Sequence, residues 1–453
     1  MSRIPARSHG ARKLRAERSY LARQAVLPIE KFIHSETTGA LVLFAAAVTA
    51  LIWANSPWAG SYFAIWKQQL GFSIGGVSLV NDLRHWINDG LMAVFFFVVG
   101  LEIKRELVQG ELASLRQAAL PAIAALGGMV LPACIYLALN PGGVQARGWG
   151  IPMATDIAFA IGVLALLGKR IPAPLRTLLL ALAIADDLGA ILVIALFYTS
   201  QLSLAALAIS AVLLSVFWLM RAIGVTNSVA YTLVGIAFWA GILESGVHAT
   251  IAGVILGFMV PIKPWFSHGT FLESAESLLG RFRSATESQD ERTAQSALGE
   301  FEELTVRTES TAERLEREFH PLVSYVVLPL FAFANAGVSL VGGQPGAVFT
   351  NRVALGTALG LVLGKVLGIV GFSWAAVRLR LAELPHRVNL RLLTGMGLVA
   401  GVGFTVSLFI TSLAFEDDWL LTSAKIGILC GSLLAGLLGY TWLRLVTGGA
   451  SHD

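Results

Sequence analysis

Asp186 and Asp187 follow one another inside the run LALAIADDLGAILVIALFY, residues 180–198, which is otherwise almost all Ala, Leu, Ile and Val. An ionisable side chain at the centre of a membrane helix costs roughly 2.5–3.5 kcal/mol and is a functional candidate by default. Consecutive helical residues point about 100° apart, so the two carboxylates cannot easily share one partner. We expect one of them to face a basic residue and the other to face a water-filled cavity.

Lys365, in GLVLGKVLGIVG, is the only basic residue that we find deep inside an apolar run, which makes it the natural partner of one aspartate. An alternative is a buried ion pair that only fixes helix packing. That alternative explains neither the second aspartate nor Asp156, which lies in the run GWGIPMATDIAFAIG.

Two apolar runs carry features that weaken a helix: the run around Asp156, and GMGLVAGVGFTVSLF at residues 395–409. A membrane helix is interrupted only where its free backbone groups are buried in protein or line a cavity. We expect an interruption in both runs, although glycine also serves close helix packing and that alternative stays open for the second run. The residues that mark these interruptions are Pro152, Thr155, Asp156, Gly401, Gly403 and Thr405.

Carboxylates, a hydroxyl and free backbone carbonyls are hard oxygen ligands, which suit a small hard cation better than a soft metal. No His/Cys cluster suggests a transition metal, and we expect no cofactor. Carboxylates also bind protons, and two adjacent carboxyl groups titrate as a coupled unit. A site that binds either protons or a cation is the minimal machinery of exchange.

The composition indicates a lipid environment, because 55% of the residues are hydrophobic and only 14% are charged, against about 25% in soluble domains. The net charge of +4 then reflects membrane topology, and we expect no nucleic acid as a partner. The apolar runs are long enough to cross roughly 30 Å of hydrocarbon and do not alternate in polarity as barrel strands do. We predict an all-α integral membrane protein with about twelve transmembrane helices, at residues 38–55, 84–103, 116–139, 150–168, 177–198, 203–220, 227–243, 246–261, 321–341, 353–377, 391–414 and 421–444.

Lysine and arginine are concentrated in alternate loops, which are cytoplasmic by the positive-inside rule, so we expect both termini in the cytoplasm. The basic first 35 residues lack the apolar segment of a secretory signal, and we interpret them as a cytoplasmic arm in preference to an organellar transit peptide. Cys134 and Cys430 lie in apolar runs and are expected to be packed free thiols.

The chain divides into five predicted segments. FSIGGVSLV, residues 72–80, predicts a β-hairpin on the outer side, which we expect to pack against another surface such as a second copy of itself. The segments are a basic cytoplasmic arm (1–35), helices one to eight with the hairpin (36–261), a polar cytoplasmic insertion (262–319), helices nine to twelve (320–445) and a cytoplasmic tail (446–453).

Five motifs in one order, ATDIAFAIGVLALLG, ALAIADDLGAI, SGVHATIAGVI, LPLFAFANAGVSL and GVGFTVSLFI, resemble those of the NhaA-type bacterial sodium/proton antiporters, over roughly residues 30–445. The resemblance implies inverted-topology repeats with two broken helices that cross at mid-membrane. It also implies electrogenic, pH-regulated exchange of Na+ or Li+ for protons in the bacterial inner membrane. We further expect a homodimer that forms through the outer β-hairpin.

The resemblance assigns roles residue by residue. Asp187 matches the main ligand of Na+ and carrier of protons, Asp186 its partner, and Lys365 the lysine paired with Asp186. Thr155 and Asp156 match one helix crossing, and Gly401 to Ser407 match the other.

A pH-sensing cluster is also implied at the cytoplasmic mouth, although an ordinary network of helix-end charges is an equal alternative. Arg317 stands where the family often has a histidine, and the insertion and the basic arm are longer than in the family. His248 is a further candidate, against the alternative of a packed histidine. The cluster maps to Glu102, Arg105, Glu106, Glu316 and His320.

Three other classes of protein are alternatives. An intramembrane aspartyl protease needs aspartates on two facing helices, whereas this pair is adjacent on one. A retinal protein would use Lys365 for a Schiff base but has about seven helices. A symporter or channel with the same fold is the third alternative, since a fold does not fix function.

Overall fold

The computed structural model describes residues 36–74, 77–199, 202–223, 225, 228–264, 268–339 and 351–448. The basic arm, the two glycines at the hairpin tip and the end of the tail lie outside these ranges. Within them, seven helices are long and apolar enough to cross a membrane, or up to nine when each of two bent pairs counts as one span. The chain is a mostly helical membrane protein, and the number of twelve crossings stays a prediction.

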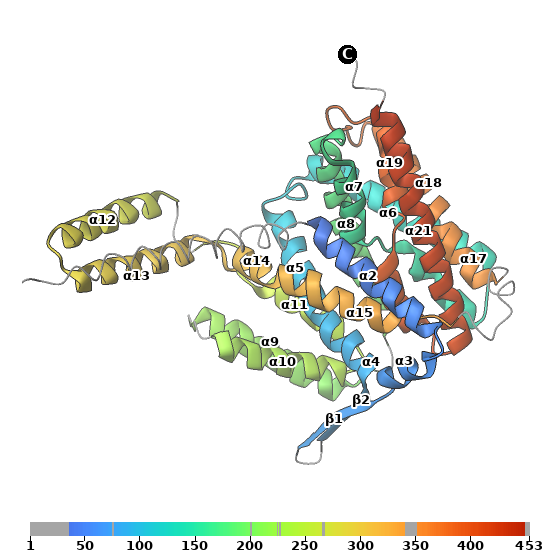
Figure 1. The fold of residues 1–453 in the computed structure, drawn as a ribbon, viewed down its shortest axis with the longest axis horizontal. Helices are drawn as coiled ribbons and strands as arrows, with labels where there is room; N and C mark the ends of the chain where they lie inside the picture. Colours follow the sequence, from blue (N-terminus) through green and yellow to red (C-terminus); the bar gives the residue numbers. More distant parts are fainter. Residues whose placement is uncertain are drawn as a thin grey trace, which may run out of the picture.

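The helices pack into one bundle, from which two helical pairs stand out (Figure 1). The first half of the bundle contains α2 (Glu36–Ala54), α3 (Ala59–Trp66), α4 (Leu83–His85), α5 (Met92–Val108), α6 (Leu115–Leu139), α7 (Ile157–Leu167), α8 (Ala173–Phe197), α9 (Leu204–Ala222), α10 (Ser228–Leu243) and α11 (Ala249–Met259). The second half contains α14 (Thr311–Leu322), α15 (Leu328–Asn335), α17 (Arg352–Leu359), α18 (Lys365–Arg378), α19 (Leu390–Val399), α20 (Phe404–Ala414) and α21 (Asp418–Gly448).

Several spans contain a short stretch of another helix type. Three π-helical stretches join α-helices end to end, and π-helical turns inside helices are frequent at functional sites. A 3-10 helix precedes α7. These stretches are η1 (Trp86–Leu91), η2 (Val144–Met153, the 3-10 helix), η4 (Val323–Val327) and η5 (Gly360–Gly364).

A glycine contact brings α6 and α18 together. Gly127 of α6 faces Gly368 of α18, and a Cβ atom on either residue would collide with the backbone carbonyl oxygen of the other. One helical turn away, Gly364 lies against Pro132 of α6. Small residues permit this close approach of membrane helices. The contact fixes the start of α18, and therefore Lys365, against the centre of the bundle.

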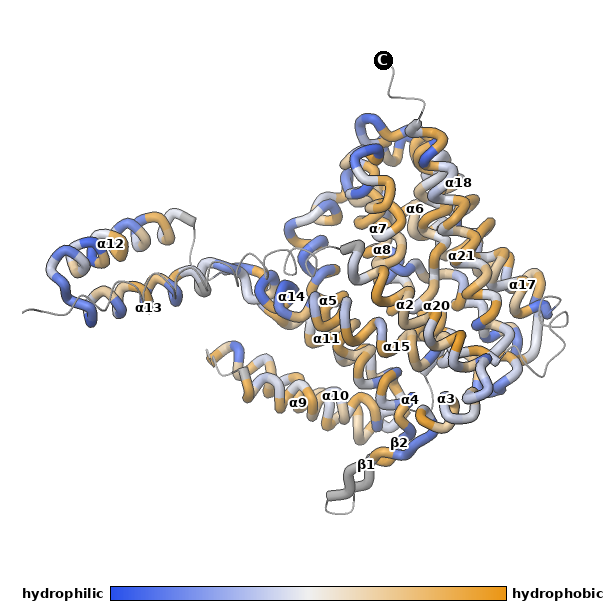
Figure 2. Tube along the Cα trace, viewed as in Figure 1, coloured by the Kyte–Doolittle hydropathy of each residue, from blue (hydrophilic) through white to orange (hydrophobic). Residues whose placement is uncertain are grey.

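The pair α9 and α10 packs together and touches the bundle through α11. Many of its apolar side chains are exposed, which suits a surface covered by lipid. Figure 2 shows the hydrophobic residues along both helices. The two cysteines are free, but both side chains are exposed. The prediction that they are packed was wrong, because an apolar run in a membrane helix also supplies the face that points outward.

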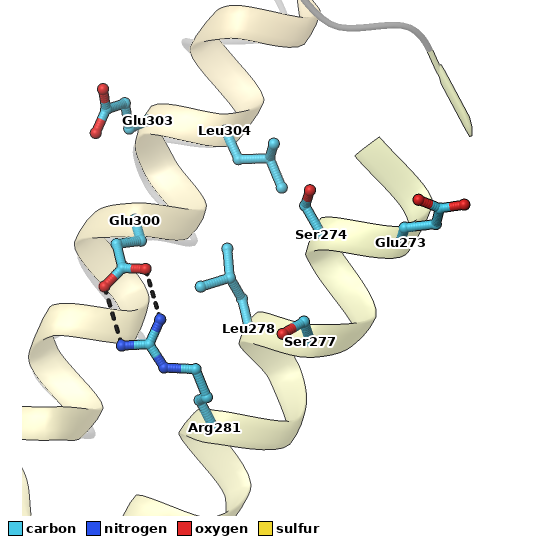
Figure 3. Close-up of a pocket in the computed structure, with 8 residues that line it drawn as sticks. All are labelled: Glu273, Ser274, Ser277, Leu278, Arg281, Glu300, Glu303 and Leu304. Carbon is cyan, nitrogen blue, oxygen red and sulfur yellow. Dashed lines mark hydrogen bonds and ion pairs between the residues drawn. The ribbon is translucent and has the colours of Figure 1, made fainter. Parts of the chain in front are cut away.

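The insertion forms a helical hairpin, α12 (His268–Glu287) and α13 (Glu291–Thr308), that projects from the bundle (Figure 1). Leu278 and Leu304 are buried between the two helices, and Arg281 makes two hydrogen bonds to Glu300 across them, at 2.7 and 3.1 Å (Figure 3). These residues line a groove of about 500 Å³. The groove belongs to the hairpin and is remote in the fold from the buried carboxylates of α8.

Two strands form a β-hairpin at one end of the bundle. β1 (Gln69–Ile74) and β2 (Val77–Asp82) run antiparallel, with Ile74 opposite Val77 next to the tip. Asp82 then caps α4 by accepting a hydrogen bond from the backbone N–H of His85 at 2.7 Å. We call this end of the bundle, which also carries α3 and the start of α21, the hairpin end (Figure 1).

Candidate functional site

Two helix interruptions lie against each other. Helix η2 ends at Met153 and α7 begins at Ile157; α19 ends at Val399 and α20 begins at Phe404, with a bend of 52° between them. The free backbone groups pair across the gap, because the N–H of Asp156 donates to the carbonyl oxygen of Val402 at 2.7 Å.

Side chains complete this pairing. The hydroxyl of Thr155 donates to the carbonyl oxygen of Ala400 at 2.8 Å, and the hydroxyl of Ser407 donates to that of Ile151 at 2.7 Å. All four residues are buried, so each hydrogen bond satisfies a carbonyl that helix hydrogen bonding leaves open. The interruptions are thereby tied to one another.

Asp156 caps two helices at once. One carboxylate oxygen accepts from the backbone N–H of Phe159, in the first turn of α7, at 3.1 Å. The other accepts from both the backbone N–H of Thr405, at 3.0 Å, and its hydroxyl, at 2.5 Å, in the first turn of α20. A carboxylate is favourable at a helix N-terminus because unpaired N–H groups give that end a partial positive charge. Asp156 therefore balances the charge of both N-termini.

Gly401 and Gly403 allow the interruptions to approach. A Cβ atom at Gly401 would collide with the carbonyl oxygen of Leu361, and one at Gly403 would lie 2.9 Å from that of Ala154. The hydroxyl of Ser432, on α21, lies 3.3 Å from the backbone N–H of Gly403 and accepts from it. Sequence reasoning missed Ser432, because a serine in an apolar helix gives no signal of its own.

Asp186 and Asp187 lie on α8, and both are buried, at 0% and 3% exposure. The ammonium of Lys365 donates to Asp186 Oδ2 at 2.6 Å, and the lysine is also fully buried. Among the described residues, Asp186 Oδ1 and Asp187 Oδ2 are buried oxygens without a hydrogen-bond partner. Each aspartate therefore keeps an oxygen that is able to accept a proton or bind a cation.

Negative charge dominates the surroundings of Asp187. The carboxylates of Asp186, Asp156 and Glu102 are near enough for their charges to act on it, while Lys365 is the cation that does so. Several carboxylates close together favour the binding of a positive charge, either a proton or a cation. In the part of the chain that the structure describes, no three His, Cys, Asp or Glu side chains are grouped to hold a metal ion.

The five residues of the expected pH-sensing cluster lie on α5 and α14. Arg105 bridges the two helices, because Nη1 lies 2.5 Å from Glu316 Oε1 and Nη2 lies 3.7 Å from Glu106. His320 is exposed, and its imidazole makes no hydrogen bond or ion pair with the described residues. The structure thus brings together Arg105, Glu106 and Glu316, and leaves His320 apart.

His248 lies outside the helix in which sequence reasoning placed it. Helix α11 begins at Ala249, so His248 is its N-cap residue, and its ring packs edge-on against Phe409, with ring centroids 6.2 Å apart. The chain turns here because Gly246 adopts a positive φ of 81°. The predicted helix 246–261 therefore starts too early.

Lys365 is also not the only basic residue buried in a predicted span. Lys425, on α21, is 7% exposed. The sequence carried the signal, since Lys425 stands in the run 421–444, but its position near one end of that run concealed its depth.

Comparison with known proteins gives one family. The model of the family described as Na+/H+ antiporter 1 matches residues 30–443. The chain is 48% identical over 427 residues to "Na(+)/H(+) antiporter NhaA 2" of Sorangium cellulosum, covering 94% of this chain and 91% of that protein. It is 45% identical to "Na(+)/H(+) antiporter NhaA" of Koribacter versatilis (96% and 95% covered) and 46% identical to the protein of that name from Shigella dysenteriae (92% and 98% covered).

Proposed function

We propose a mechanism from the premise that this chain belongs to the Na+/H+ antiporter 1 family and is a sodium/proton antiporter. It is a multi-pass membrane protein of the bacterial inner-membrane type and a transporter, not an enzyme. Its transported ions are Na+ and H+. What remains to be assigned is where and how these ions exchange.

Na+ and protons compete for Asp187 and Asp186. The observation that carries this proposal is the pair of buried carboxylate oxygens without a partner, Asp186 Oδ1 and Asp187 Oδ2. An ionised Asp187 binds Na+ with Asp186, and water supplies further oxygen ligands. A proton on Asp187 removes the charge that holds Na+. One site therefore serves both ions in turn, and Li+, another small hard cation, fits the same oxygens.

Electrogenic exchange needs a second proton for each Na+, and we place it on Lys365. Na+ and the ammonium compete for the same carboxylate of Asp186, which lies 2.6 Å from Nζ. When Na+ takes Asp186, the ammonium loses its buried partner and releases one proton. Asp187 releases the other. Two protons then leave for each Na+ that binds, so one positive charge moves per cycle.

The two interruptions form the crossing at mid-membrane, in a fold of twelve transmembrane helices with inverted repeats and both termini in the cytoplasm. The hydrogen bonds of Thr155, Asp156 and Ser407 support this proposal, since they join the interruptions to one another. Alternating access then moves the crossing relative to the remaining helices. Segment 262–319 and the terminal segments are cytoplasmic.

The cytoplasmic cluster sets the pH dependence of exchange. Arg105 joins α5 to α14, and α5 also carries Glu102, whose charge acts on Asp187. Loss of the contact between Glu316 and Arg105 frees α5 to shift. Glu106 is a further member of the cluster, whereas His320 and His248 are separate candidates for the pH response. A homodimer through the β-hairpin completes the assembly, which exports Na+ with the proton motive force and contributes to salt tolerance and intracellular pH control.

The test uses proteoliposomes with an acidic interior, reported by a fluorescent amine. Na+, Li+ or K+ is added outside at pH values from about 6.5 to 8.5. We expect Na+ and Li+ to collapse the gradient and K+ to leave it unchanged. Asp187→Asn should be silent, whereas Asp417→Asn, which changes an exposed carboxylate, should behave as wild type. Exchange at the wild-type rate in Asp187→Asn would overturn the proposal.

A further inference from the structure

Lys425 is buried at the hairpin end without a partner in the described part of the chain. No acceptor lies within hydrogen-bond distance of its ammonium there, and its electrostatic neighbours are Arg84 and Asp418. Lysine is almost never fully buried unless it is paired, because an ammonium loses its hydration when it is buried. The position therefore calls for an anion.

Arg84 adds a second positive charge near Lys425. It lies on α4, and its Nε is a buried donor without a hydrogen-bond partner among the described residues. Its side chain is partly buried, and its positive charge repels that of Lys425. A protein that keeps both cations in place needs an acceptor between them.

Trp66, at the end of α3, supplies a third donor. Its ring is 4% exposed, and Nε1 has no hydrogen-bond partner among the described residues. Tyr62 lies one turn earlier on α3, and its ring packs against that of Trp66, with ring centroids 6.0 Å apart. The charge of Arg84 acts on the hydroxyl of Tyr62. The donors of α3 and α4 therefore belong to one region.

Helix α21 reaches the same region through the segment that follows α15. The hydroxyl of Tyr62 accepts from the backbone N–H of Gly337 at 3.2 Å. Val338, the next residue, packs against Ile426, which follows Lys425 on α21. Tyr62 of α3 and Ile426 of α21 therefore both contact this short segment, and the charge of Arg84 acts on both Tyr62 and Lys425.

The nearest carboxylate does not neutralise the cluster. Asp418 opens α21, seven residues before Lys425, which is about 10 Å along the helix axis. It is exposed and makes no ion pair with Lys425. Asp418 therefore acts on Lys425 only at a distance, from the exposed start of α21.

We propose that Lys425, Arg84 and Trp66 bind the phosphate group of an anionic lipid. A phosphate offers several charged acceptor oxygens to three donors that have none, and Arg with Lys is the usual combination that binds it. Basic pockets between membrane helices are known binding sites for lipid headgroups. Exposed tryptophans at the same end, Trp58 at 74% and Trp419 at 47%, indicate the headgroup level, where such rings gather. Free inorganic phosphate shares this chemistry, and the test separates the two sources.

The test measures the unfolding temperature of the delipidated full-length protein in a neutral detergent. Phosphatidylglycerol, phosphatidylcholine or inorganic phosphate is added. We expect phosphatidylglycerol to raise the unfolding temperature by several degrees and phosphatidylcholine to have no such effect, because a ligand that binds only the folded state stabilises it. If inorganic phosphate alone gives the increase, the site is right and the ligand is a free anion.

Lys425→Met separates this proposal from a structural role. Without lipid the variant should unfold at the wild-type temperature or above it, because a buried charge without a partner has gone. With phosphatidylglycerol it should lose at least half of the wild-type increase, and Arg84→Gln should lose part of it. Arg352→Gln is the matched control, since Arg352 is exposed at the start of α17, which packs against α21, and it should keep the full increase.

Three outcomes would overturn the proposal. The first is that neither phosphatidylglycerol nor inorganic phosphate stabilises the wild type. The second is that Lys425→Met keeps the full increase. The third is that lipid-free Lys425→Met unfolds well below the wild type, which would show a partner within the protein. None of these outcomes depends on transport, so the test stands apart from that of the exchange mechanism.

Discussion

Asp186 and Lys365 form a contact of 2.6 Å between side chains that are both completely shielded from solvent. The contact joins α8 to α18, two helices that are far apart in the sequence. Next to it, Asp187 is buried without a cation at hydrogen-bond distance. Lys365 thus neutralises Asp186, whereas Asp187 has no cation bound to it in the described part of the chain.

Asp186→Asn should strongly destabilise the protein, because it leaves the Lys365 ammonium buried without a charged partner. Breaking a buried pair on one side costs about 3–5 kcal/mol. The double variant Asp186→Asn/Lys365→Met should recover most of this loss, although both variants should be inactive. Thermal unfolding in detergent checks the prediction, and equal stability of the single and double variants would contradict it.

Thr405→Val should lower stability by about 1–3 kcal/mol, because it removes one of the donors to the buried Asp156 carboxylate. The backbone N–H of residue 405 remains in place, so the fold should persist. Exchange should also fall, since α20 loses a tie to α7. Thr441→Val is the control: its hydroxyl bonds only within α21 and its side chain is exposed. Equal unfolding temperatures for the two variants would argue against this role of Asp156.

Gly368→Ala should destabilise the contact between α6 and α18 by about 1–3 kcal/mol, the usual result of overpacking. The added Cβ atom would collide with the backbone carbonyl of Gly127. Gly371→Ala, on the same helix, meets no atom within 4 Å and should be neutral or stabilising. Unfolding temperatures of the two variants, measured side by side, decide the matter, and loss in both would indicate a helix effect unrelated to the contact.

Glu316→Gln should displace the pH profile of exchange. The neutral side chain weakens the contact between α14 and Arg105 of α5, so the coupling of the cytoplasmic cluster to the exchange site should change. The matched control is Glu309→Gln. Glu309 follows α13 and binds Arg317, the residue after Glu316 on α14, so this variant leaves the Arg105 contact unchanged. Exchange in proteoliposomes from pH 6 to 9 provides the measurement. Identical profiles for wild type and Glu316→Gln would remove this glutamate from pH control.

The projecting hairpin should loosen in acid. Hydrogen bonds from Arg281 hold the pKa of Glu300 below its usual value. The contribution of this pair to stability is therefore present above the pKa of an unfolded glutamate, about 4.3, and is lost as the pH falls through the lower folded value. Hydrogen exchange of α12 and α13 should accelerate at about pH 3.5 relative to pH 6, after correction for the intrinsic rate. Glu300→Gln should show no such change, and the same acceleration in both proteins would assign it to another group.

The buried acidic residues and their contact with Lys365 could be predicted, because a charged side chain in an apolar run needs either an ion-pair partner or a function. Lys365 needed an anion, and α8 offered the nearest candidates. The same reasoning overlooked Lys425, since a residue near the end of a run can lie deep when neighbouring segments fold over it. His248 was misplaced because the turn at Gly246 depends on backbone conformation, which hydropathy does not reveal.

The hydrogen bonds that tie the two helix interruptions together could not be predicted from the sequence. The pairing of Thr155 with the carbonyl of Ala400 requires two interruptions in register, and neither run contains information about the other's position. The contact between Arg105 and Glu316 spans more than two hundred residues and followed only from the family resemblance. Local patterns identify the residues that need partners, and the assembled bundle decides which partners they meet.

The glycine contact between α6 and α18 has a mechanical consequence. Since Gly127 and Gly368 leave no room for even one added carbon atom, the two helices are packed backbone against backbone at this point. We expect α6 and α18 to move together during transport, with Lys365 held at the contact between them. We expect the movement that opens the carboxylates first to one side and then to the other to leave this contact intact, so that the ammonium of Lys365 keeps its distance from α6.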